Sequence, residues 1–287
     1  MALQRVRTLL PENALVTVPR LFHYDSVEHA LIMEDSGPRS RTLKAHLLDP
    51  TTVITPDDAA RLGTAIGYFL SVLHIEGSTD RELMDCVATN EEGKRLCALL
   101  SYDELDGKLR DMGAAGPSEQ ELEEIRQLSE ETSKMMMEAD TVFTMGDFWT
   151  GNMIVRTDDS GRIIKAFVVD WEVCKPGLPY LDFGQFLAEM HCLRFFYPHS
   201  TDNVNNVLQA YSTEYRRRFA VDDNYVRRAL GHVGSHLIAW TRFVPDWKPE
   251  ERVVEARQAG AQYLLKCARG ETGWLRESII GDVFRDI

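Results

Sequence analysis

Residues 141–171, TVFTMGDFWTGNMIVRTDDSGRIIKAFVVDW, restrict the possible folds of this chain most strongly. Two apolar runs flank the turn sequence at 158–161, DDSG, and this pattern predicts a β-hairpin. Asp147 and Asn152 lie on a short irregular segment before the hairpin, and Asp170 follows the second apolar run. Because a hairpin brings its two ends together, Asn152 and Asp170 are expected to lie close to each other.

These oxygen-bearing side chains suit phosphoryl transfer that depends on Mg²⁺. Asn152 and Asp170 supply the neutral and charged oxygen ligands that a partly hydrated Mg²⁺ accepts. Asp147 can accept or orient the proton of an attacking hydroxyl group. Taken singly, an Asp or Asn beside a strand is more often a turn residue than a ligand. It is their combination on one hairpin that indicates a site.

The run MGDFWTGNMIV and the later VVDWE resemble the catalytic region of the aminoglycoside phosphotransferase and choline kinase superfamily. The pattern of that superfamily is H-G-D-x-x-x-x-N, a hairpin, and then I-D-W/F/Y-E. The resemblance implies that Asp147 is the catalytic aspartate and that Asn152 and Asp170 bind Mg²⁺. It also implies ATP as co-substrate. LIMEDS resembles the nucleotide hinge, which implies that the backbone at Glu34 and Ser36 holds the adenine.

The chain departs from the family pattern close to the expected catalytic loop. Met145 stands where the family usually has a histidine that supports this loop. Asp182-Phe183-Gly184 spells the metal-binding motif of protein kinases, but it comes after the hairpin has closed at Asp170. The resemblance instead implies that Asp182 supports the catalytic loop through hydrogen bonds.

The resemblance implies an α+β, protein-kinase-like fold with a truncated small β lobe and a large, mainly helical C-terminal lobe that carries the catalytic hairpin. Residues 1–37 are then a remnant of the N-terminal lobe and hinge, and residues 38–287 form the helical lobe. The first glycine is Gly37 and the first lysine is Lys44, so the Gly-rich loop and strand lysine of such kinases are missing. A truncated gene product or a genuine remnant, with weak nucleotide binding, is expected.

Helix signals are clear at several places. Thr55-Pro56 followed by two acidic residues predicts a helix start, and Ser118 with Glu121 predicts a capping box. After residue 180 the pattern predicts helices near 183–195, 203–219, 223–243 and 249–269, with Gly270 as a stop.

Histidines and other polar residues near 232–246 permit more than one interpretation. His232 and His236 are four residues apart, but no adjacent Glu completes a zinc-protease motif, so histidines satisfied within the protein are expected. The resemblance implies that this helix lies near the acceptor cleft, where Trp240 and Asp246 would contact the substrate.

Composition excludes several classes of protein. The net charge of −13 argues against a general binder of nucleic acid or of anionic membranes. No apolar segment of transmembrane length occurs in this sequence, and no signal peptide is expected. Its 5 cysteines form no C-x-x-C pair, which is typical of reduced thiols in the cytoplasm. No protein partner is indicated.

The leading hypothesis is a kinase of small metabolites that transfers the γ-phosphate of ATP, with Mg²⁺, to a hydroxyl group of its acceptor. The alternative is a catalytically inactive, kinase-like binding module, because the elements that clamp the nucleotide are missing. A metal-dependent hydrolase using the same carboxylates is a third interpretation. The acidic character of the chain favours a cationic acceptor such as an aminosugar or an amino alcohol.

Overall fold

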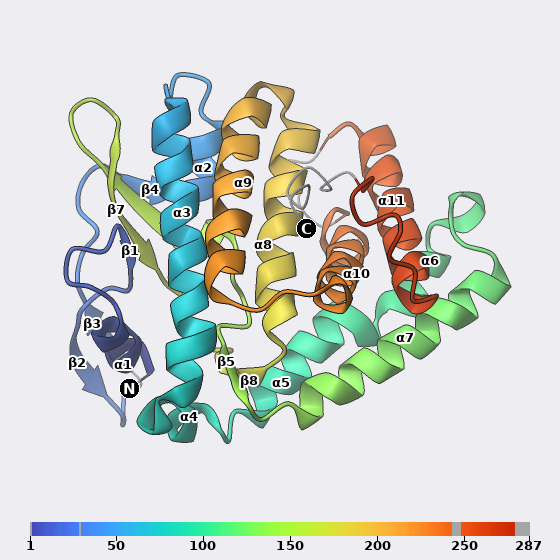
Figure 1. Cartoon of the computed structure of the whole chain (residues 1–287), viewed down its shortest axis with the longest axis horizontal. Helices are drawn as coiled ribbons and strands as arrows, with labels where there is room; N and C mark the ends of the chain where they lie inside the picture. The colour runs from blue at the N-terminus through green and yellow to red at the C-terminus, as the bar shows by residue number, and fades with distance from the viewer. Residues whose placement is uncertain (1, 29, 243–247, 279–287) are drawn as a thin grey trace.

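The computed structural model describes residues 2–28, 30–242 and 248–278. It has the predicted α+β class, because long helices make up most of the molecule and the strands form small sheets. In Figure 1 most of the strands lie to the left, and the long C-terminal helices pack side by side in the centre and to the right. None of the helices in the described residues combines the length and apolarity required to cross a membrane.

Helices and strands alternate irregularly along the chain. The helices are α1 (Ala2–Leu9), α2 (Leu43–Leu48), α3 (Pro56–Val72), α4 (Arg81–Val87), α5 (Glu91–Ala98), α6 (Leu105–Arg110), α7 (Glu119–Glu138), α8 (Pro179–Phe196), α9 (Thr201–Arg218), α10 (Asp223–Trp240) and α11 (Glu250–Ala268). Short helical turns are η1 (Leu73–Gly77), η2 (Leu99–Asp103), η3 (Gly113–Ala115), η4 (Thr150–Asn152) and η5 (Pro198–Ser200). The strands are β1 (Val16–Thr17), β2 (Leu21–Asp25), β3 (Ala30–Met33), β4 (Ser40–Thr42), β5 (Val142–Thr144), β6 (Met153–Thr157), β7 (Ile163–Val168) and β8 (Lys175–Gly177).

The predicted helix signals are confirmed. The Thr55 hydroxyl accepts a hydrogen bond from the amide of Asp58, and Pro56 is the first residue of α3. Ser118 and Glu121 form both hydrogen bonds of a capping box at the start of α7. Gly270 follows α11 with φ +69°, a conformation that favours glycine, and so ends that helix as expected.

The segment between α3 and α7 was not predicted in detail. It holds α4, α5 and α6, which have only 6 to 8 residues each. Helices this short show too few turns for a reliable hydrophobic periodicity, and they depend on tertiary packing for their stability. The short strands β1, β4, β5 and β8 give an equally weak signal, since each has 2 or 3 residues.

The predicted hairpin is present, with β6 and β7 antiparallel and Met153 opposite Val168. It lies at the centre of a sheet in the order β1-β7-β6-β4. The outer strands come from the beginning of the chain: β1 pairs parallel to β7, and β4 pairs antiparallel to β6. The first 42 residues therefore fix the hairpin on both sides. The predicted domain boundary at residue 37 falls between these two strands and stays a prediction.

A large core holds the helical part together and supports the hairpin. Its closest helix contact is between α3 and α9, where Gly63 and Gly67 face the backbone of α9. A Cβ atom on Gly63 would lie 2.2 Å from the carbonyl oxygen of Val207. The absence of a side chain at Gly63 is therefore what allows the two helices to approach each other so closely.

Gly63→Ala is expected to lower the free energy of unfolding by about 1–3 kcal/mol, because the added methyl group forces α3 and α9 apart. Urea denaturation monitored by circular dichroism measures this change. Gly107→Ala on α6 is the matched control, since no atom lies within 4 Å of the added methyl group. The control should gain up to about 1 kcal/mol from helix propensity. Equal stability of the two variants would contradict the close packing of α3 against α9.

Candidate active site

Asp147 lies on the loop between β5 and η4, and its carboxylate is oriented by neutral donors. Gln185 Nε2 donates to Asp147 Oδ1 at 2.7 Å. Asn152 Nδ2 donates to Oδ2 at 2.7 Å, and Trp149 Nε1 donates to the same oxygen at 3.2 Å. These three hydrogen bonds fix the direction of the carboxylate. A carboxylate has about four lone-pair positions, so one on Oδ1 is left for a further donor.

Burial determines the pKa of Asp147. Desolvation raises the pKa above its ordinary value, and the negative charge of Asp170 raises it further. The hydrogen bonds from Gln185, Asn152 and Trp149 act in the opposite direction but do not overcome the desolvation. A carboxylate whose pKa lies above the usual range of an aspartate is a better proton acceptor than a free one.

Asn152 and Asp170 lie at the two ends of the hairpin, as predicted. Asn152 Nδ2 also donates to the carbonyl oxygen of Asp147 at 3.1 Å. Because both partners of this amide nitrogen are acceptors, the Oδ1 atom of Asn152 must face away from Asp147. Within the described residues, that oxygen accepts no protein hydrogen bond.

Asp170 follows β7 with φ +66° and is the one described non-glycine residue with positive φ. Such a conformation is strained for most side chains, although Asp tolerates it better than most residues, and it is often found at functional sites. The carboxylate of Asp170 is exposed and lines the same cavity as Asp147. Two free oxygen donors of different charge therefore fit a hydrated divalent cation. No group of three or more His, Cys, Asp or Glu side chains in the described residues forms a complete metal cage.

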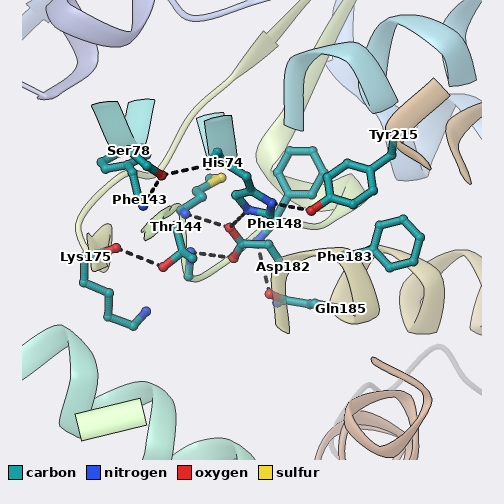
Figure 2. Close-up of polar contacts among 12 residues, drawn as sticks. His74, Ser78, Phe143, Thr144, Phe148, Lys175, Asp182, Phe183, Gln185 and Tyr215 are labelled. Atoms are coloured by element: carbon teal, nitrogen blue, oxygen red, sulfur yellow. Dashed lines mark hydrogen bonds and ion pairs between the residues drawn. The ribbon is translucent and has the colours of Figure 1, made fainter. Parts of the chain in front are cut away.

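Asp182 supports the loop that carries Asp147 through hydrogen bonds to its backbone (Figure 2). Its Oδ2 atom accepts a hydrogen bond from the amide of Met145, and Oδ1 accepts one from the amide of Gly146, both at 2.8 Å. His74 Nε2 lies 3.2 Å from Oδ2, and the other ring nitrogen of His74 lies 2.7 Å from the hydroxyl of Tyr215. The supporting role predicted for Asp182 is thereby confirmed.

The pKa of Asp182 is shifted in the opposite direction to that of Asp147. Complete burial alone would raise its pKa, but the hydrogen bond and charge of His74 and the amide of Gly146 more than offset this effect. The pKa of Asp182 therefore lies below its ordinary value, and the side chain stays anionic under the loop. Met145, which stands where the resemblance implies a histidine, is fully buried.

The predicted adenine-binding residues lie on another segment. Glu34 follows β3, and its carboxylate accepts hydrogen bonds from the amide of Arg20 at 3.1 Å and from Arg7 at 3.4 Å. The carbonyl oxygen of Ser36 accepts a hydrogen bond from the hydroxyl of Ser40 at 2.5 Å. Pairing of β4 with β6 brings this segment alongside the hairpin. The described residues contain no direct contact between Glu34 or Ser36 and Asp147, so their role stays a prediction.

Comparison with known proteins decides the family. A model of the phosphotransferase enzyme family, APH, matches residues 2–221. The chain belongs to this family. The predicted resemblance is therefore confirmed.

Two relatives of the chain are named as kinases. The chain is 32% identical over 243 residues to a 4-hydroxytryptamine kinase of Psilocybe cyanescens, an alignment that covers 83% of this chain and 63% of that protein. It is 28% identical over 274 residues to a 4-hydroxytryptamine kinase of Psilocybe cubensis, with 93% and 72% covered. Among solved structures, a choline/ethanolamine kinase family protein from Mesorhizobium loti is 14% identical, with 98% of this chain and 80% of that chain covered and a TM-score of 0.47.

A cavity of about 200 Å³ opens beside Asp147. Asp170, Glu172 and Asp182 line its polar side together with Gln185. The remaining wall is mostly apolar or aromatic and comes from α5, η2, α7, α8 and α10; it includes Leu96, Cys97, Leu100, Met136, Leu178, Leu181, His232, His236 and Trp240.

Both histidines of α10 have partners inside the protein, as predicted. His232 Nδ1 lies 3.2 Å from the hydroxyl of Tyr102, and His236 Nε2 lies 2.7 Å from Glu189 Oε1. Trp240 lines the cavity, in agreement with its expected position near the acceptor cleft. Asp246, the other predicted acceptor contact, lies outside the described residues.

Sequence reasoning missed Gln185, which makes one of the shortest contacts to Asp147. A signal was available, since Gln185 is three residues after Asp182 and so lies on the same face of α8. It also missed the hydrogen bond from Trp149 Nε1 to Asp147. Such contacts join residues through tertiary structure, and spacing alone does not reveal them.

Asp182→Asn is expected to lower the free energy of unfolding at pH 7 by about 1–3 kcal/mol, because one loop amide loses its acceptor. A carboxylate with a depressed pKa contributes stability above its unfolded-state pKa and loses it as the pH falls through the folded-state value. The difference in the free energy of unfolding between wild type and variant should therefore become smaller below about pH 4. Urea denaturation at several pH values measures it. A difference that stays constant with pH would count against an ionised Asp182.

Proposed function

We propose that this protein is a small-molecule kinase, which transfers the γ-phosphoryl group of ATP to a hydroxyl group of an acceptor bound beside Asp147. Membership of the phosphotransferase family and the two kinase relatives support this activity. The observation that carries the proposal is the Asp147 carboxylate, which is held by three neutral donors at the wall of a cavity and retains a free lone pair. Five free cysteines are in keeping with the predicted cytoplasmic location.

Asp147 has the properties of a general base for this reaction. Its raised pKa favours acceptance of the hydroxyl proton as the acceptor oxygen bonds to phosphorus and the bond to ADP breaks. Gln185 and Asn152 prevent the carboxylate from rotating away. Since both are neutral, they orient the base without pairing its charge.

Asn152 and Asp170 would hold Mg²⁺ through their side-chain oxygens. When bound, the ion neutralises charge on the terminal phosphates of ATP. The backbone near Glu34 and Ser36 would bind adenine, and residues 1–37 would act as the nucleotide-facing part of the chain. These assignments follow from the family pattern and from the pairing of β4 with β6 beside Asn152.

The cavity favours a hydroxylated aromatic amine as acceptor. Its apolar wall suits a flat ring, and the Trp240 indole stands at one edge. Glu189 is buried behind His236, and its second carboxylate oxygen has no protein partner among the described residues. That charge can attract a protonated amine through the cavity wall. The two relatives are named 4-hydroxytryptamine kinases, and 4-hydroxytryptamine is a hydroxylated aromatic amine.

Asp147→Asn is expected to reduce phosphate transfer by roughly 10²–10⁴-fold, because the amide cannot accept the hydroxyl proton. The wild-type rate should fall as the pH drops through a value above the usual range of aspartate, since the pKa of Asp147 is raised. Release of ADP in the presence of MgATP and 4-hydroxytryptamine measures the rate. Asp85→Asn on the exposed face of α4 is the matched control and should retain full activity. Undiminished turnover in Asp147→Asn would eliminate the proposed base, and an inactive wild type would favour the binding module.

Trp240→Ala is expected to raise KM for a hydroxylated aromatic amine by roughly three- to tenfold, with a smaller change in kcat, because a stacking surface is lost. Trp240→Phe should keep most of the affinity. Initial rates with 4-hydroxytryptamine, choline and an aminoglycoside compare the acceptor classes. A preference for the aminoglycoside, or equal KM values in the three proteins, would contradict the proposed acceptor.

A further inference from the structure

Lys175 and Cys97 form a close pair in the wall of the acceptor cavity. Lys175 is the first residue of β8 and is only 4% exposed, and its ammonium lies 3.0 Å from the sulfur of Cys97 on α5. The same ammonium donates to the carbonyl oxygen of Val173 at 3.1 Å. Both side chains line the cavity that contains Asp147. In Figure 2 no dashed line joins the ammonium of Lys175 to the His74–Asp182 network.

The buried ammonium of Lys175 lacks an anionic partner. No carboxylate in the described residues lies within 4.0 Å of it. The positive charge of Lys175 helps to lower the pKa of Asp182. Both oxygens of Asp182, however, already accept hydrogen bonds from the loop amides or contact His74. The other buried lysine, Lys94, does have a carboxylate, Glu91, at 3.5 Å. A buried cation is costly unless it is paired, and the Cys97 sulfur is the side-chain atom in reach of Lys175.

The pair also contacts the catalytic loop. Cys97 Sγ lies 3.6 Å from the carbonyl oxygen of Gly146, the residue before Asp147. Gly146 has φ +83°, and a Cβ atom there would lie 2.2 Å from the Lys175 ammonium. The ammonium is therefore packed against the backbone that positions Asp147. A change in size or charge at Cys97 would act on this loop as well as on the cavity.

The remaining cysteines lack this environment. Burial raises the pKa of Cys174 to about 12, and it also raises those of Cys192 and Cys267, so these thiols are protonated and shielded. Cys86 is exposed on α4 and lies apart from the acceptor cavity. Cys97 therefore differs from the others in combining access to the cavity with contact to a buried cation.

We propose that Cys97 and Lys175 form a modification site that reacts with peroxides and other small, soft electrophiles that enter the acceptor cavity. The ammonium lies 3.0 Å from the sulfur, in position to pair with the thiolate, which is the form of the side chain that reacts. With hydrogen peroxide, the sulfur attacks one oxygen, the O–O bond breaks, and the other oxygen leaves as water after protonation. Sulfur is oxidised to sulfenic acid and peroxide is reduced.

A thiol reductant reverses this modification. A first thiol forms a mixed disulfide with Cys97 and releases water, and a second thiol releases the Cys97 thiol as the external disulfide forms. While oxidised, the sulfur occupies the cavity wall and crowds the carbonyl group of Gly146. Loss of phosphate transfer is the expected consequence, and this consequence alone rests on the proposed kinase function.

Alkylation rates test the site without reference to catalysis. The full chain is treated with iodoacetamide under native conditions, and the modified peptides of Cys97 and Cys86 are quantified by mass spectrometry over time. Lys175→Met should slow alkylation of Cys97 by about tenfold, because the thiolate loses its cation. Lys175→Arg keeps the charge and should retain most of the rate. The rate at Cys86 should be the same in all three proteins, and thermal melting shows whether each variant is folded.

An unchanged rate at Cys97 in folded Lys175→Met would overturn the proposal. If that variant does not fold, dimedone labelling of peroxide-treated wild type decides instead. Dimedone should label sulfenic acid at Cys97 and leave Cys86 largely unlabelled, whereas preferential labelling of Cys86 would refute the site. In an active enzyme, dithiothreitol should restore the activity lost to peroxide, and Cys97→Ser should lose a smaller fraction of its own activity. These labelling results stand even if the protein transfers no phosphate.

Discussion

The buried carboxylate of Asp182 is the interaction on which the rest of the site depends. It joins α8 to the loop that carries Asp147 through the amides of Met145 and Gly146, and it joins both to η1 through His74. One turn further along α8, Gln185 holds Asp147 directly. The same helix thus fixes the backbone of the loop and the orientation of its reactive side chain. Since a buried anion must keep its donors, the loop cannot move without a large cost in free energy.

Features encoded by local sequence were predictable. The hairpin follows from two apolar runs around a turn, and the caps at Thr55 and Ser118 follow from side chains that bond to amides within the same turn. Asn152 and Asp170 could be brought together in advance because a hairpin fixes which residues lie at its two ends. The role of Asp182 came from family resemblance and not from spacing, which on its own suggests a kinase metal ligand.

Features that depend on distant parts of the chain were not predictable. Lys175 and Cys97 are separated by 78 positions, and nothing near either residue indicates the other. Helices α4 to α6 are too short to be recognised before their partners in the core are known. The cavity beside Asp147 has walls from α5, η2, α7, α8 and α10 and from the strands β5 and β8, so no single motif describes it.

Asp147 and Asp182 show how the same side chain acquires two roles within one loop and its support. Both are removed from water, and desolvation is the largest influence on the pKa of each. Asp147 receives its hydrogen bonds from neutral side chains, which do not overcome the desolvation, so it can take up a proton. Asp182 receives two backbone amides and the imidazole of His74, which do overcome it, so it stays charged as a fixed support. The donors and charges around each carboxylate, rather than its burial, therefore give the two side chains pKa shifts of opposite sign.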